Sequence, residues 1–161
     1  MLLKGAIADG AAGGETIVFG GKNTSVAVVP AMLLCDEPCV VENLPDIEDI
    51  HVVYDMLNLL GAKVDYDPKA RRMTVDPRPV NSFHVPYQYT QRMRASYYLM
   101  GALLGRFGHA HVALPGGCNF ASRPIDQHIK GFLALGAEVE ETEDYVALRS
   151  GSDGLQGSRL S

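Results

Sequence analysis

An internal repeat limits the possible folds of this chain more than any other feature. The first copy contains A-M-L-L at residues 31–34, V-V-E-N-L-P at 40–45 and L-G-A-K-V at 60–64. The second copy contains A-L-L-G at 102–105, H-V-A-L-P-G at 111–116 and L-G-A-E-V at 135–139. Each copy closes with a polar turn and a short predicted strand, at residues 73–76 and 145–149. Self-similarity of this kind indicates one supersecondary unit used twice.

Apolar spacing predicts the helices of each copy. In the first, apolar side chains recur three or four residues apart after Asp46, the predicted cap, and Gly61 is the predicted end. In the second, Ser122 is the predicted cap, with Pro124 in the first turn, and Gly136 is the predicted end. Short strands alternating with helices then give an α/β (α+β) fold of repeated helix–strand–helix–strand–strand units.

Two further predictions concern helix faces. One long helix is expected over residues 89–106, with one apolar side formed by Met93, Tyr97, Met100 and Leu104. The last helix is expected to bury the face formed by Ile125, Ile129, Phe132 and Leu133.

The remaining segments are less regular. Residues 1–21 are rich in glycine and alanine, with one strand candidate at 16–19. Residues 76–87 are rich in proline and are expected to form an extended connector between the copies. Residues after 149 have no core pattern, and we expect them to be a truncated tail.

Charge and composition narrow the possible partners. With 14 Lys and Arg against 19 Asp and Glu, the net charge is −5, which argues against nucleic-acid binding. No apolar run reaches the roughly 18 residues of a membrane helix, so we expect no membrane partner and a cytoplasmic protein. Three cysteines in no paired spacing fit a reducing compartment. Cys35 and Cys39 could share a metal ion, but nothing nearby completes a site, so no metal is expected.

Three segments contain residues with catalytic potential. In G-G-K-N-T-S (20–25), Lys22 stands at a predicted helix start, where an anion is favoured, although a solvated lysine is the simpler interpretation. In Q-R-M-R-A-S (91–96), Arg92 and Arg94 would point in different directions on a helix, and a charged helix start is again the simpler interpretation. In residues 114–128, glycines present Cys118 close to Arg123. A cysteine near positive charge can act as acid, base or nucleophile, so here we favour a functional role.

Taken together, these segments resemble the UDP-N-acetylglucosamine 1-carboxyvinyltransferases, also called UDP-N-acetylglucosamine enolpyruvyl transferases. The resemblance covers roughly residues 13–150 and rests on G-G-K-N, R-M-R-A-S, L-P-G-G-C, R-P-I-D-Q-H and the twice-used L-G-A-x-V. The sister family, 3-phosphoshikimate 1-carboxyvinyltransferase, shares the fold and the lysine but lacks the L-P-G-G-C loop. The resemblance implies an inside-out α/β barrel, here incomplete.

The resemblance also implies a reaction and a set of site residues. The enolpyruvyl group of phosphoenolpyruvate would pass to the 3-hydroxyl of UDP-N-acetylglucosamine, releasing phosphate, as the first committed step of peptidoglycan synthesis. No cofactor is implied. Cys118 matches the proposed proton donor and fosfomycin target, and Lys22, beside Asn23, matches the contact to phosphoenolpyruvate. The positions that match the surroundings of the nucleotide sugar are Arg94, Arg123, Pro124, Ile125, Asp126 and Gln127.

This chain has fewer repeats than the family pattern, and this difference determines the domain organisation that we expect. Family members have two domains of three repeats, so residues 21–150 correspond to two repeats of the N-terminal domain, and 151–161 to the truncated tail. Residues 1–20 match a strand that packs with the second domain. We therefore expect this chain alone to be inactive, with self-association through exposed edges. The alternatives are a 3-phosphoshikimate-type enzyme and a non-catalytic sugar-nucleotide binding or interaction module.

Overall fold

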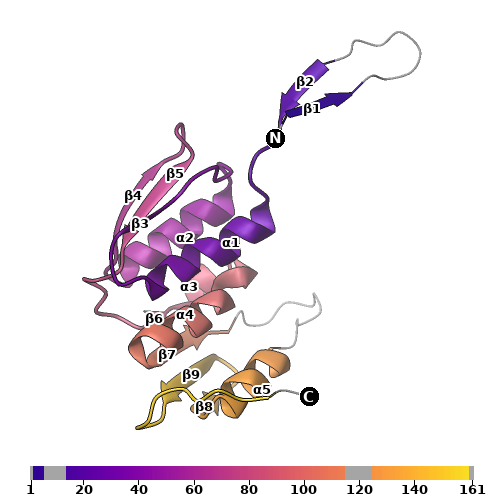
Figure 1. Cartoon of the computed structure of the whole chain (residues 1–161). Coiled ribbons are helices and arrows are strands. Elements are labelled where there is room, and N and C mark those ends of the chain that lie inside the picture. Colours follow the sequence, from indigo (N-terminus) through magenta and orange to yellow (C-terminus); the bar gives the residue numbers. More distant parts are fainter. Residues whose placement is uncertain (1, 6–13, 115–124, 160–161) are drawn as a thin grey trace.

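A layer of helices occupies the middle of the molecule. The structure is a computed structural model that describes residues 2–5, 14–114 and 125–159 (Figure 1). Helices α1 (Lys22–Ala31), α2 (Glu48–Leu59) and α4 (Tyr98–Phe107) pack against one another, with α1 in contact with both of the others. Their apolar spacing produces this layer, since the buried side chains recur on the facing sides. These include Val26, Val29, Ile50, Val53, Leu57, Leu99 and Leu103.

Two open sheets lie outside this layer, and their topology repeats. Strands β3 (Cys39–Val41), β4 (Lys63–Asp67) and β5 (Arg72–Asp76) form an antiparallel sheet in the order β3-β5-β4. Strands β7 (His109–Ala113), β8 (Ala137–Glu141) and β9 (Tyr145–Ser150) take the same order, β7-β9-β8. In each sheet the last strand of the unit lies between the other two. The predicted repeat and the α/β class are therefore confirmed.

The second sheet has an additional strand that the sequence did not indicate. Strand β6 (His84–Val85) lies within the proline-rich connector and pairs parallel to β7. The four strands are ordered β6-β7-β9-β8, and α4 covers their inner face (Figure 1). The connector is thus tied to the second unit by its own short strand.

The helix predicted over residues 89–106 is broken into three pieces. Helix α3 (Tyr87–Thr90) is followed by a 3-10 turn, η2 (Arg94–Tyr97), and then by α4. Met93 is extended, with φ −139° and ψ 108°, and its side chain is buried. The single-helix prediction is wrong because the break at Met93 places this side chain in the core. A shorter 3-10 turn, η1 (Met32–Leu34), follows α1.

Helix α5 (Asp126–Ala134) differs from its predicted packing. No residue of α5 is fully buried, and Leu133 is 55% exposed. Ile125, Ile129 and Phe132 are half-buried against the core. The prediction of a buried face is therefore wrong for Leu133, because α5 packs on β8 at the edge of its sheet, where one side of the helix stays open.

The predicted helix ends are correct at both glycines. Gly61 and Gly136 adopt φ 94° and 83°, the left-handed conformation that ends α2 and α5. The predicted cap Asp46 is wrong, since α2 begins at Glu48 after an extended Ile47. The Asp46 carboxylate instead lies 2.7 Å from Nε2 of His51. The other predicted cap, Ser122, and Pro124 lie outside the described residues.

The N-terminal strands form a separate hairpin. Strand β1 (Leu2–Gly5) pairs antiparallel with β2 (Gly14–Ile17), which begins two residues before the predicted strand at 16–19. The hairpin lies apart from both sheets (Figure 1). Across the described residues, no helix has the length and apolar character needed to cross a membrane.

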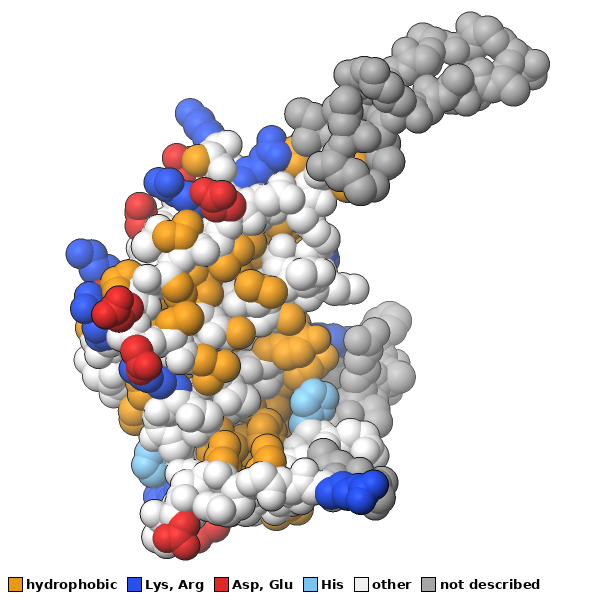
Figure 2. Space-filling model, in the orientation of Figure 1, with side chains coloured by type: hydrophobic (Ala, Val, Ile, Leu, Met, Phe, Trp, Pro, Cys, Tyr) orange, Lys and Arg blue, Asp and Glu red, His pale blue; other side chains and the backbone are white. Residues whose placement is uncertain are grey.

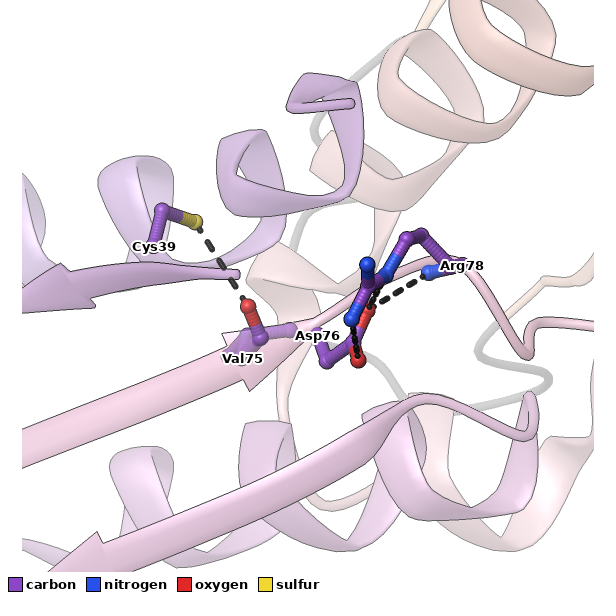
Figure 3. A network of polar contacts seen from close by, with 4 residues as sticks. All are labelled: Cys39, Val75, Asp76 and Arg78. Carbon is purple, nitrogen blue, oxygen red and sulfur yellow. Dashed lines mark hydrogen bonds and ion pairs between the residues drawn. The ribbon is translucent and has the colours of Figure 1, made fainter. Parts of the chain in front are cut away.

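The connector begins with a local ion pair that turns the chain out of β5. Arg78 donates through Nε and Nη2 to the two carboxylate oxygens of Asp76, at 2.9 and 2.8 Å, and its backbone N–H also donates to this carboxylate (Figure 3). The hydrogen bonds and charge of Arg78 hold the pKa of Asp76 below its usual value of 3.8. The turn is therefore stabilised only while Asp76 is ionised.

Burial on α2 gives a first prediction. Leu57 is 0% exposed and Leu59, two residues on, is 42% exposed. We expect Leu57→Ala to lower the free energy of unfolding by about 2–5 kcal/mol, because it leaves a cavity in the helical layer. The matched Leu59→Ala should cost less than about 1 kcal/mol. Urea unfolding measures both, and equal losses would contradict the assigned packing.

The Asp76–Arg78 pair gives a prediction about pH. Because the folded pKa of Asp76 is lowered, its stabilising effect is complete above the unfolded pKa and disappears as the pH falls through the folded pKa. Arg78→Ala should therefore lower the urea midpoint at pH 7, and the difference from wild type should shrink below about pH 4. Arg72→Ala, at an exposed position on β5, is the control. A difference that persists unchanged at pH 2 would refute this account.

Candidate functional site

The start of α1 is held in place by a close backbone contact. Gly20 N–H donates to the carbonyl oxygen of Asn43 at 3.2 Å, and a Cβ at Gly20 would lie only 2.3 Å from that oxygen. Gly20 is therefore required by space. At Gly21 a Cβ would meet nothing closer than Thr24 Oγ1 at 3.7 Å. Alanine would therefore fit at Gly21, whereas Gly20 tolerates no larger residue.

Lys22, the first residue of α1, is paired with the first turn of α2. Its Nζ lies 2.9 Å from Oδ2 of Asp49, whose side chain is 22% exposed. The Lys22 side chain remains 58% exposed, so its ammonium group can still reach a ligand. Asn23 follows on the exposed side of the same turn. An acidic partner in the first turn also complements the dipole of α2.

A second cation joins the same turn of α2. Arg92 forms an ion pair with Glu48 through Nη2, and its Nη1 lies 3.9 Å from Oδ2 of Asp55. The hydrogen bond to Glu48 raises the pKa of Arg92. Arg94, two residues on, is exposed at the start of η2, and no ion pair is found for it within the described ranges. The two arginines therefore differ, one bound to α2 and the other available.

The start of α5 lies beside η2. The rings of Tyr97 in η2 and His128 in α5 contact edge to face, with centroids 5.0 Å apart. His128 is in the first turn of α5, together with Asp126 and Gln127, which are exposed. Ile125 precedes this turn and packs against the core. This contact places the start of α5, with Asp126 and Gln127, beside η2, which begins at Arg94.

These contacts bring the start of α1, the residues before η2 and the start of α5 to one end of the helical layer. Lys22–Asp49 joins the starts of α1 and α2, Arg92–Glu48 adds the segment before η2, and Tyr97–His128 adds the start of α5. Lys22 and Arg94 thus offer exposed positive charge beside the starts of α1, α2 and α5, an arrangement suited to anionic ligands. Cys118, Arg123 and Pro124 lie outside the described residues.

The described residues on either side of residues 115–124 are held by the second unit. On one side, Leu114 N–H donates to the carbonyl oxygen of Asp144 at 2.7 Å, which ties the end of β7 to the turn before β9. On the other side, Ile125 packs against the core. The positions of these flanks are therefore set by the second unit, next to η2.

Sequence reasoning missed the acidic partners. Glu48 and Asp49 pair with Arg92 and Lys22, yet neither stood out in the sequence. Their only local signal is their place in the first turn of a predicted helix, where acidic residues are common for electrostatic reasons alone. A partner 27 or 44 residues away along the chain leaves no local pattern.

Cys35 and Cys39 lie close together, at a distance from the candidate site. The Cys39 thiol is 3.7 Å from the carbonyl oxygens of Met32 and Val75, the latter across the β3–β5 pair (Figure 3). Burial, and then the neighbouring Cys35, raise the pKa of Cys39 from 9.0 to about 11. In the described part of the chain, no group of three or more His, Cys, Asp or Glu residues is arranged to hold a metal ion.

Solved structures define the class of protein. The enolpyruvyl transferase NikO from Streptomyces tendae matches with a TM-score of 0.70 and 27% identity, over 86% of this chain and 29% of that chain. EPSP synthase from Acinetobacter baumannii matches with a TM-score of 0.59 over 84% of this chain and 32% of that one, and at 17% identity it supports the fold alone. The fold is that of the enolpyruvyl transferases.

The sequence comparison then gives the family. A family profile described as EPSP synthase (3-phosphoshikimate 1-carboxyvinyltransferase) matches residues 9–160. The chain therefore belongs to this family. It is 48% identical over 147 residues to UDP-N-acetylglucosamine 1-carboxyvinyltransferase 3 of Caldanaerobacter subterraneus. It is equally similar, over the same length, to UDP-N-acetylglucosamine 1-carboxyvinyltransferase 2 of Listeria monocytogenes. It is 44% identical over 154 residues to UDP-N-acetylglucosamine 1-carboxyvinyltransferase 2 of Bacillus subtilis.

The extent of these matches is unequal. They cover 91–92% of this chain but only 34–35% of the relatives. The chain therefore spans about a third of the length of the curated relatives that it matches.

The raised pKa of Cys39 predicts slow alkylation in the folded chain. At pH 8, a pKa of about 11 leaves a thiolate fraction of about 0.001, against about 0.1 for a pKa of 9.0. We expect iodoacetamide to label Cys39 up to about 100-fold more slowly in the folded chain than in urea. Peptide mapping by mass spectrometry follows Cys39 separately from the other two cysteines. Equal rates in the two states would show that the thiol is not shielded.

Proposed function

We propose that this chain forms part of an enzyme that transfers the enolpyruvyl group of phosphoenolpyruvate to the 3-hydroxyl of UDP-N-acetylglucosamine, with release of phosphate. The observation that carries the proposal is the meeting of the Lys22, Arg94 and Asp126 segments at one end of the helical layer. The 48% identity to proteins named UDP-N-acetylglucosamine 1-carboxyvinyltransferase supports this substrate pair.

The proposed roles follow from charge. Both substrates are anionic, so a shared site needs cations that offset their mutual repulsion. Lys22, exposed beside Asn23 at the start of α1, would contact phosphoenolpyruvate. Arg94 would contact the nucleotide sugar, together with the described residues Ile125, Asp126 and Gln127 and the flanking Arg123 and Pro124.

Asp49 would position Lys22 for this role. The 2.9 Å contact holds the ammonium group at the start of α1 and keeps it from spreading over many rotamers. Because the pair is partly exposed, its own contribution to stability is small. Its value lies in orientation, since an incoming phosphate can share the same ammonium group.

Cys118 would be the proton donor. Transfer by addition and elimination requires a proton at C3 of phosphoenolpyruvate while the sugar 3-hydroxyl gives its proton to a base and its oxygen attacks C2. The tetrahedral intermediate then loses one C3 proton and phosphate, which restores the carbon–carbon double bond. General acid catalysis of this kind contributes about 10²–10⁴-fold. As the matching residue of the family's L-P-G-G-C loop, Cys118 would also be the point of fosfomycin attack.

The proposal extends to domain organisation. Residues 21–150 would be two of three repeats of the N-terminal domain, residues 1–20 a strand that pairs with the second domain, and residues 151–161 the tail that leads onward. Apolar side chains gather over the helical layer on the face seen in Figure 2. Exposed apolar residues include Val28 on α1, Leu59 on α2 and Tyr98 on α4, and Leu133 on α5 beside the second sheet. In a protein as long as the relatives, the other two thirds of the chain would cover these surfaces.

Without that remainder the chain would lack part of its active site. The family resemblance assigns an aspartate base and an arginine for phosphoenolpyruvate to the second domain, so we propose that the 161-residue chain is inactive alone. Its uncovered apolar surfaces and open strand edges would favour self-association. We also propose that this reaction takes place in the cytoplasm as a step of peptidoglycan synthesis, because the sugar nucleotide is a cytoplasmic precursor.

A chimaera tests the proposed reaction directly. This chain would replace the matching 147-residue segment of the Caldanaerobacter relative, and phosphate release from phosphoenolpyruvate would be measured. We expect fosfomycin-sensitive release with UDP-N-acetylglucosamine, none with shikimate 3-phosphate, and none from the 161-residue chain alone. Lys22→Ala should lower the rate about 10²–10³-fold. Lys69→Ala, in the exposed turn between β4 and β5, should leave the rate unchanged.

Three other results of this experiment would contradict parts of the proposal. Release with shikimate 3-phosphate in place of the sugar nucleotide would assign the chain to the sister activity. A folded chimaera that binds UDP-N-acetylglucosamine without turnover would favour a binding module. Turnover by the 161-residue chain alone would refute the proposal that the rest of the protein is needed. Cys118→Ala in the chimaera should abolish most of the release.

A further inference from the structure

A pair of histidines lies on the second sheet, on the face turned away from the helices. The parallel register of β6 and β7 places His84 directly opposite His111. Their Nδ1 atoms are 2.7 Å apart, and their ring centroids are 4.7 Å apart. This contact joins two residues that are 27 positions apart in the chain. Neither residue belongs to the proposed catalytic site.

The pair borders a hollow of about 660 Å³ on the outer face of the sheet. Ala147 pairs with His111 on one side and with Glu140 on the other, so its small side chain leaves space in this row. Glu138, Glu140 and Arg149 are among the charged residues that line the hollow. A small ligand that reaches the histidines would therefore meet two carboxylates nearby.

A second set of contacts orients His111 and brings negative charge to it. The Tyr145 ring stacks on the His111 ring, with centroids 4.4 Å apart. The Tyr145 hydroxyl donates to Oε1 of Glu140 at 2.7 Å. Glu140 lies close enough for its charge to act on the His111 ring. Ordered neighbours that fix the orientation of an imidazole favour its use as a metal ligand.

We propose that His84 and His111 form a two-imidazole site for a divalent transition-metal ion such as Zn²⁺ or Ni²⁺, with water completing the coordination. Metal–nitrogen bonds of about 2.0–2.1 Å place two ligand nitrogens about 3 Å apart at the right angle of an octahedral ion and about 3.3 Å apart at the tetrahedral angle, so the two rings would separate by roughly 0.3–0.6 Å from the present spacing. Imidazole suits these ions, whereas Mg²⁺ and Ca²⁺ prefer oxygen ligands. Glu140 supplies the neighbouring negative charge.

A metal ion at this position would link two parts of the fold. Strand β6 has only two residues, and besides its pairing with β7 it is held by the His111 N–H bond to the Phe83 carbonyl oxygen, at 2.8 Å. It leads through Pro86 into α3 and then to Arg94. A bound ion would clamp the connector between the repeats onto the second sheet. An ion that binds only the folded state would also raise the melting temperature of the chain.

The test is Ni²⁺ binding to the untagged 161-residue chain, measured by calorimetry. We expect one Ni²⁺ that His84→Asn and His111→Asn each weaken by at least about tenfold, because one of two ligands is lost. Asparagine places its amide group near the position of Nδ1 and can therefore replace the hydrogen bond between the two side chains. Weaker Ni²⁺ binding by these variants would then report the loss of a metal ligand and not the loss of that hydrogen bond. His109→Asn, on the same strand and face, is the matched control and should bind as the wild type does.

Two further measurements keep the proposal open to refutation. Paramagnetic Ni²⁺ should broaden the imidazole resonances of His84 and His111 in the unaltered chain, and leave those of His51 sharp. This arm does not depend on the variants folding. Mg²⁺ should neither bind nor compete. The proposal is overturned if the wild-type chain binds no Ni²⁺ at millimolar concentration, or if both asparagine variants bind it unchanged.

Discussion

The burial of three helices against one another is the constraint on which the rest of the structure depends. Helix α1 contacts α2 from the first unit and α4 from the second, so it joins the two repeats into one core. Side chains such as Val29, Leu57 and Leu103 lose all contact with solvent there. Each fully buried side chain of this kind contributes about 1.5–3 kcal/mol. The two sheets pack on the outside of this layer, one on the side of α2 and the other on the side of α4.

The same packing determines the candidate site. The starts of α1, α2 and α5 carry Lys22, Asp49 and Asp126, and their positions follow from which helices touch. An ion pair joins Lys22 to Asp49 at the surface, where such pairs stabilise little but orient the groups that they hold. An exposed ammonium group at a helix start, with a carboxylate beside it, is well prepared for a phosphate group. The candidate site is thus a consequence of the core.

Local patterns predicted a large part of this molecule. The L-G-A-x-V segments predicted where α2 and α5 end and β4 and β8 begin, because glycine after an apolar helix adopts φ values that other residues avoid. The motif segments also singled out Lys22 and Asp126, which lie at the starts of α1 and α5. The prediction failed where long-range packing outweighed local preference. Met93 interrupts the expected helix to bury its side chain, and α5 lies at a sheet edge that leaves Leu133 exposed.

By itself, the sequence determined the repeated unit, the α/β class and the identity of Lys22, Arg94 and Asp126 as candidates, since spacing and residue type along a short stretch carry that information. Only the tertiary structure decided the partners: Asp49 for Lys22, Glu48 for Arg92, and His111 for His84. These pairs depend on which helices touch and on the register of β6 against β7. Contacts and register are selected by the burial of whole faces, which involves residues far apart in the chain, so no local pattern specifies them.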